Sequence, residues 1–103
     1  MCNISEENKK IAYHCGYKEQ SNQLIEECAE LIQAVNKYRR AMSRIHSKDV
    51  DIALENLIEE IADVEIMLEQ IKYLLQIPEE DIQAMKLYKV NRTRERILGN
   101  KGE

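Results

Sequence analysis

The sequence predicts an all-α protein, an antiparallel helical bundle of about four helices that is completed by oligomerisation. Three observations support this prediction. The chain of 103 residues contains only one Pro and three Gly. Its apolar residues recur at helical spacing through long stretches that contain neither residue. One phrase occurs twice, at 24–31 and 57–64, each time as Leu-Ile-Glu-Glu, an apolar residue, Ala, an acid and an apolar residue. A helical chain of this length buries a modest core, so we expect further copies to complete it.

The helices are expected in one domain that covers residues 1–103. Ser5, followed by two Glu residues, predicts a capped helix start, and Gly16 predicts a stop. Pro78 predicts the start of the last helix, because proline fits the first helical turn. The predicted helices are a short N-terminal helix over 5–15, long helices over 17–45 and 50–76, and a C-terminal helix over 78–98.

Each long helix carries an apolar stripe with residues three and four positions apart. The stripes are Leu24, Cys28, Leu31, Val35 and Tyr38 in the first helix, and Leu57, Ile61, Val64, Leu68, Ile71 and Leu75 in the second. Such stripes are typical of helices that pack against one another within a chain or between subunits. We expect the two long helices to pack through them.

A pair of acids at i, i+3 borders each apolar stripe, on the same side of it. The pairs are Glu27 with Glu30 and Glu60 with Asp63. Acids with this spacing are usually a solvated helix face, but two pairs in equivalent phase can bring four carboxylates together if the stripes pack. Four close carboxylates repel one another unless protons or a cation neutralise them, and oxygen-rich sites suit Mg²⁺ or Mn²⁺. The neighbouring Glu26 and Glu59 point farther from the stripes and are expected to be solvated.

The C-terminal helix has polar residues on its apolar side. Asn91 and Arg94 fall within the arc formed by Ala84, Leu87 and Val90. Polar side chains on a core-facing arc need partners. Two interpretations are open: a structural pair, in which Asn91 bonds a neighbour and Arg94 extends its head to water, or a pair that contacts a ligand.

Composition argues against several classes. The net charge of −4 leaves no basic surface for nucleic acid, and no apolar run is long enough for a membrane span. The first residues lack the features of a signal peptide, so a cytoplasmic protein is expected. Cys2, Cys15 and Cys28 form no C-x-x-C motif, so a disulfide framework is not expected.

The phrase Glu26-Glu27-x-x-Glu30, followed by Glu60-x-x-Asp63, resembles the acidic signature of the MazG-like nucleotide pyrophosphohydrolases. The resemblance covers about residues 16–97, and Asn91-x-x-Arg94 is similar to a polar pair in the last helix of that family. It implies an all-α homo-dimer or homo-tetramer. It also implies Mg²⁺-dependent hydrolysis of (deoxy)nucleoside triphosphates to monophosphate and pyrophosphate, a housecleaning activity on the nucleotide pool.

The resemblance also implies roles for individual residues. Glu27, Glu30, Glu60 and Asp63 would be the catalytic metal ligands, and Asn91 and Arg94 would contact the nucleotide or its phosphates. Family members often carry Lys four residues before the Asn. This chain has Leu87 there, so Lys86 or Lys89 would take that role. The Trp that stacks the base in some members is absent, and the possible replacements are Tyr17, Tyr38, Tyr73 and His46.

Three other functions compete with this interpretation. A non-enzymatic helical interaction protein would account for the stripes but not for the shared phase of the acid pairs. A di-iron carboxylate protein would need Glu-x-x-His pairs, and neither His14 nor His46 follows an acid of the two phrases at that spacing. A phosphoribosyl-ATP pyrophosphatase would share the metal ligands and differ in substrate.

Overall fold

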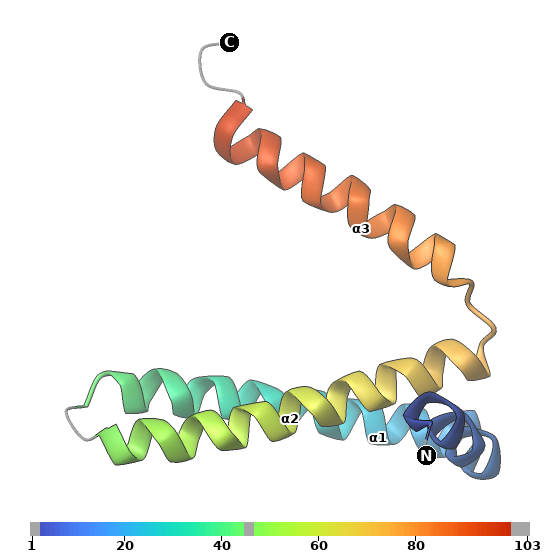
Figure 1. The fold of residues 1–103 in the computed structure, drawn as a ribbon, viewed down its shortest axis with the longest axis horizontal. Helices are drawn as coiled ribbons and strands as arrows, with labels where there is room; N and C mark the ends of the chain where they lie inside the picture. Colours follow the sequence, from blue (N-terminus) through green and yellow to red (C-terminus); the bar gives the residue numbers. More distant parts are fainter. Residues whose placement is uncertain (1–2, 45–46, 100–103) are drawn as a thin grey trace.

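The chain is all-α, as predicted. The structure is a computed structural model that describes residues 3–44 and 47–99, and in this part of the chain it contains three α-helices and no strand. Helix α1 spans Ile4–Met42, α2 spans Ser47–Leu74 and α3 spans Glu79–Arg94, followed by one π-helical turn at Glu95–Gly99. The elements form a long antiparallel hairpin of α1 and α2, from which α3 projects (Figure 1).

Gly16 breaks α1 into a short N-terminal segment, residues 4–15, and a long helix, residues 17–42. Its φ of 86° and ψ of 166° lie in a region that only glycine adopts without strain. A Cβ at Gly16 would meet no atom within 4 Å, so the backbone angle alone requires glycine there. The segment begins one residue before the predicted start. Asn3 caps it, and Asn3 Oδ1 accepts a hydrogen bond of 3.0 Å from the Glu6 N–H. The prediction that Ser5 is the cap is therefore wrong.

The ends of the long helices differ by a few residues from the predicted bounds. Helix α1 ends at Met42, where Ser43 turns back to bond the Arg40 carbonyl; Ile45, its predicted end, lies outside the described residues. Helix α2 ends at Leu74 rather than at residue 76. Gln76 adopts a left-handed φ of 56°, and Ile77 N–H donates to the Lys72 carbonyl at 2.9 Å, which closes the helix end.

The hairpin packs through part of each stripe and through the neighbouring positions on the acid-bearing side. The contact between α1 and α2 buries Ala34, Ala41, Val64 and Met67, and it partly buries Glu27 and Glu60. On the stripe of α2, Val64 is buried and Leu57 and Ile71 are partly buried. The exposed fractions of the other three members are 42% at Ile61, 45% at Leu68 and 49% at Leu75. Ile61 directly follows Glu60, so it points about 100° away around the helix axis. The expected packing through the stripes therefore holds in part within one chain, because the contact is shifted from the stripes towards the acid-bearing sides.

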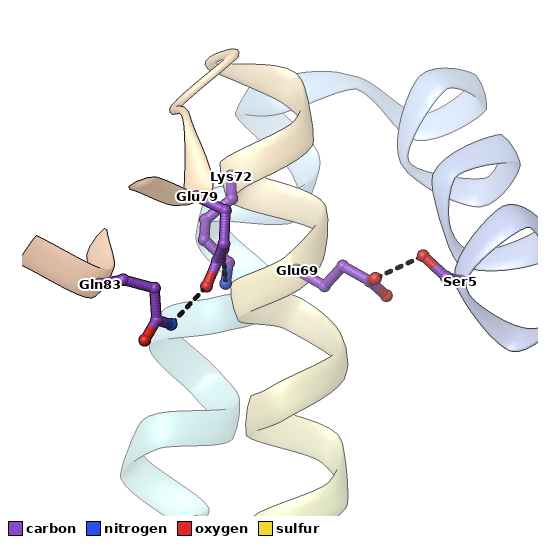
Figure 2. Close-up of polar contacts among 5 residues, drawn as sticks. All are labelled: Ser5, Glu69, Lys72, Glu79 and Gln83. Carbon is purple, nitrogen blue, oxygen red and sulfur yellow. Dashed lines mark hydrogen bonds and ion pairs between the residues drawn. The ribbon is translucent and has the colours of Figure 1, made fainter. Parts of the chain in front are cut away.

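A polar network attaches the N-terminal segment to the end of α2. Asn8 and Gln70 are 5% and 2% exposed, and Gln70 Nε2 donates to Asn8 Oδ1 at 2.6 Å. Asn8 Nδ2 donates to Glu69 Oε1 at 2.8 Å, and Ser5 Oγ donates to Glu69 Oε2 at 2.6 Å (Figure 2). Gln20, beyond the Gly16 break, donates to Gln70 Oε1 at 2.7 Å. These bonds satisfy the buried amides and fix the angle of the segment.

Helix α3 does not pack on the hairpin of its own chain. None of its residues is buried, and it is held near its start by an ion pair of 3.1 Å between Lys72 and Glu79 (Figures 1 and 2). The radius of gyration is 17.9 Å, whereas a compact chain of this length has one of about 13 Å. Among the described residues, no helix combines the length and apolarity needed to cross a membrane.

Candidate metal centre

The acid pairs meet in the groove between α1 and α2, about midway along the hairpin. Glu27 and Glu30 come from α1, and Glu60 comes from α2. One carboxylate oxygen of each lies within 4.8 Å of those of the other two. The equivalent phase of the two phrases is the cause, because an antiparallel pair of helices brings matching sides to one groove. Asp63, the fourth predicted ligand, is not part of this triad.

Two oxygens of the triad are buried and lack hydrogen-bond partners. They are Glu27 Oε1 and Glu60 Oε1. The other oxygen of Glu27 is held, since Gln23 Nε2 donates to Glu27 Oε2 at 2.7 Å. A buried carboxylate oxygen without a partner loses its hydration and gains nothing in return. The groove therefore presents two acceptors that require a proton or a cation.

The electrostatics of the groove favour neutralisation. Burial raises the pKa of Glu60, and the negative charges of Glu30, Asp63 and Glu27 raise it further. Burial likewise raises the pKa of Asp63, and the negative charges of Glu27 and Glu59 raise it further. Asp63 thus belongs to the same electrostatic cluster, although it stands outside the triad. A cation would remove the repulsion that these shifts record.

The geometry of the triad fits a divalent cation. Oxygens that share one Mg²⁺ at about 2.1 Å lie at most about 4.2 Å apart. The three oxygens lie within 4.8 Å of one another, which is close to this value, and a small side-chain rotation would close the difference. All three donors are carboxylates, the class of ligand that Mg²⁺ and Mn²⁺ prefer. Glu27, Glu30 and Glu60 can therefore hold such an ion, with Asp63 beside them.

Within one chain, the residues that are predicted to contact the substrate lie far from the acidic cluster. Lys86, Asn91 and Arg94 are all on α3, which leaves the hairpin beyond the far end of α2 (Figure 1). Arg94 donates a long hydrogen bond of 3.4 Å to Asn91 Oδ1, so the two polar residues contact each other. Hydrogen bonds from Gln83 and Lys72 lower the pKa of Glu79, and the charge of the exposed Lys86 adds a smaller effect in the same direction.

The candidates for base stacking are spread along the hairpin. Tyr73 lines a cavity of about 670 Å³ at the end of α2, with Lys9 Nζ 5.8 Å from the centre of its ring. Ten residues of helix separate it from Asp63, a distance of about 15 Å. Tyr38 is half-buried near the other end of the hairpin, and Tyr17 is exposed beside the Gly16 break. His46 lies outside the described residues.

The predictions overlooked two groups of residues. One is the network of Asn8, Gln20 and Gln70, for which the sequence carries no distinctive motif. The other is a set of cations, Lys37, Arg40 and Arg44, which line a cavity beside the acidic cluster. Lysine and arginine near a helix C-terminus are common for electrostatic reasons, so the sequence alone gave no reason to single them out.

Comparison of the chain with models of known protein families, with curated proteins and with solved structures finds no match.

Proposed function

We propose that this chain is a Mg²⁺-dependent nucleoside triphosphate pyrophosphohydrolase of the MazG-like kind that works as a homo-oligomer. One observation carries the proposal: the buried, unpartnered Oε1 atoms of Glu27 and Glu60 lie in one triad with Glu30. A structural cluster of acids would be expected to turn its oxygens to water or to bond them. Here, the groove keeps two of them without partners and raises the pKa of Glu60.

In the proposed site, Glu27, Glu30 and Glu60 hold the cation, and Asp63 adds negative charge next to them. The bound ion would neutralise the triphosphate and lower the pKa of the water that attacks the α-phosphorus. Gln23 fixes Glu27 through Oε2, which would leave Oε1 free to bind an ion. Rigid helices carry all of these groups, so the ligands are held in place before the substrate binds.

In the proposed assembly, the residues of one copy that contact the substrate would lie at the acidic cluster of another copy. Helix α3 carries Asn91, Arg94 and Lys86 and has no packing partner in its own chain. The stripe on α2 is exposed at Ile61 and Leu68. Two copies can cover both surfaces by laying α3 against the partner hairpin, and this arrangement brings the polar pair towards the acids. Whether the assembly is a homo-dimer or a homo-tetramer depends on how the remaining apolar surface is covered.

A substrate screen tests the proposal. Pyrophosphate release is measured across deoxynucleoside and nucleoside triphosphates and phosphoribosyl-ATP while Mg²⁺ or Mn²⁺ is titrated. We expect metal-dependent release with one substrate class and ³¹P NMR signals of monophosphate and pyrophosphate. Release of orthophosphate and diphosphate would contradict the mechanism.

A helical interaction protein is the second candidate, and the exposed apolar residues of α2 and α3 favour it. In that case, the screen would give no turnover with any substrate or metal, and the oligomer would form without a metal requirement.

A further inference from the structure

The groove between α1 and α2 also contains a cationic cavity of about 420 Å³, between the acidic cluster and the loop of the hairpin. Its lining includes Lys37 and Arg40 from α1, Arg44 just beyond the end of α1, and Asp49, Ile52 and Asn56 from α2. Three cations thus share the cavity with one carboxylate. Within residues 3–44 and 47–99, none of the three cations makes an ion pair. The cavity therefore has positive charge that the described chain does not neutralise.

The cavity and the acidic cluster lie along the same line of the groove. Lys37 stands at i+7 from Glu30, so it lies on nearly the same face of α1, and Arg44 follows two residues after the helix ends at Met42. Asn56 stands four residues before Glu60, which is about 6 Å along α2. A ligand that extends along the groove from Glu60 towards the loop therefore passes directly from the acids to the cations.

The cations are suited to phosphate. Arg40 and Arg44 each present a planar fork of N–H donors that matches phosphate oxygens, and Lys37 adds a compact point charge. The beginning of α2 contributes the positive end of a long helix to the same cavity, where Asp49 and Ile52 line it. Asn56 offers an amide donor on the side nearest to Glu60. The three charged side chains are exposed at the rim, so a ligand can reach them from solvent.

We propose that this cavity binds the terminal pyrophosphate portion of a triphosphate whose α-phosphate lies at the acidic cluster. The inference rests on the proposed function, which it deepens by assigning the direction of the substrate in the groove. Carboxylates alone repel a triphosphate, whereas the positive charge of Lys37, Arg40 and Arg44 favours its outer phosphates on the side of the groove that leads to the cavity. Negative charge accumulates on the outer phosphates when the bond between the α and β phosphates breaks, and these cations would stabilise that charge. Hydrolysis of the triphosphate at this bond would then leave pyrophosphate in the cavity.

Titration calorimetry with inorganic pyrophosphate in a buffer containing EDTA tests the site. EDTA removes the divalent ions through which the acids could bind phosphate, so any binding reports on the cavity. We expect the wild-type chain to bind, and Arg44→Gln and Lys37→Gln each to weaken binding about tenfold, the loss expected for one charge-assisted hydrogen bond. Arg39→Gln is the matched control. It removes an adjacent exposed arginine of α1 that does not line the cavity, and its affinity should stay within about twofold of wild type.

A second variant separates the cavity from the metal centre. Glu60→Gln should bind pyrophosphate in EDTA at least as tightly as wild type, because it removes a nearby negative charge. If no nucleotide is hydrolysed but pyrophosphate binds with this pattern, the proposed function fails and the cavity remains a phosphate site. Absence of pyrophosphate binding by the wild type, or equal losses from Arg39→Gln and Arg44→Gln, would overturn the inference even if hydrolysis depends on Glu60. Circular dichroism of each variant confirms that these surface changes leave the helices folded.

Discussion

Glu27 and Glu60 face each other across the groove between α1 and α2, and each keeps a buried Oε1 atom without a hydrogen-bond partner. The two residues occupy equivalent positions in the repeated phrase, one on each helix. Like charges at this distance destabilise the hairpin unless something lies between them. A proton or a cation would relieve this repulsion, and the first prediction tests a cation in this position.

Mg²⁺ is expected to stabilise the folded protein. At a free concentration of about 100 times its dissociation constant, an ion that binds only the folded chain raises the free energy of unfolding by about 2.7 kcal/mol. Thermal denaturation with and without Mg²⁺ measures the effect, and Glu60→Gln should reduce the shift. An equal shift in wild type and in Glu60→Gln would show that the ion binds elsewhere.

Glu60→Gln is expected to abolish turnover while the metal-free protein becomes more stable than wild type. The change keeps the shape of the side chain and removes one of the charges that raise the pKa values in the cluster. Loss of a ligand should lower the rate by orders of magnitude. Steady-state kinetics and urea denaturation at neutral pH measure both effects.

Glu59→Gln is the control for Glu60→Gln. Glu59 is exposed and lies outside the triad, so its variant should keep nearly the wild-type rate. Equal losses of activity from the two variants would mean that the helical phase assigned to the site is wrong.

The chain is expected to be at least a dimer at micromolar concentration. Leu68 is 45% exposed on the stripe of α2, and Leu87 and Val90 of α3 are 63% and 64% exposed. Leu68→Glu should dissociate the oligomer, because it places a charge in the apolar interface. Sedimentation velocity measures the size, with Glu55→Lys as an exposed charge change off the stripe. A wild-type monomer would contradict the proposed assembly.

Chains that carry different defects are expected to complement each other. Arg94→Ala should be inactive or nearly so, as should Glu60→Gln, because each copy supplies α3 to the acids of another. Co-refolding the two variants in equal amounts should restore about a quarter of the wild-type activity in a dimer, since half of the dimers are mixed and each has one intact site. A mixture that remains inactive would show that Arg94 does not act in the partner site.

Glu69 is expected to make stability depend on pH. Hydrogen bonds from Ser5 and then Asn8 lower its pKa below the ordinary value of 4.5. Because the folded state lowers this pKa, the ionised Glu69 carboxylate stabilises the folded protein fully above pH 4.5. This stabilisation is lost as the pH falls through the pKa that Glu69 has in the folded state. Glu69→Gln should therefore cost about 1 kcal/mol at neutral pH, and the difference from wild type should shrink in acid.

Urea denaturation at several pH values tests this effect, with Glu65→Gln as the exposed control on the same helix. Hydrogen exchange in residues 4–15 should rise in the Glu69→Gln variant, because those bonds attach the N-terminal segment to α2. A difference between the Glu69 variant and wild type that stays constant with pH would contradict the assigned role of its charge.

The sequence by itself determined the helices, the break at Gly16 and the shared phase of Glu27 and Glu60. These features depend on local preferences and on the 3.6-residue period, both of which can be read along one chain. The sequence did not determine which side of each helix would face the other. Periodicity places Ile61 and Glu60 on different sides of α2, but an apolar side can be buried within a chain or between chains, so either side could meet α1. Only the tertiary structure decided that the acid-bearing sides meet, that Lys37 and Arg44 line the same groove and that α3 leaves its own hairpin, because these outcomes depend on contacts between residues far apart in the sequence.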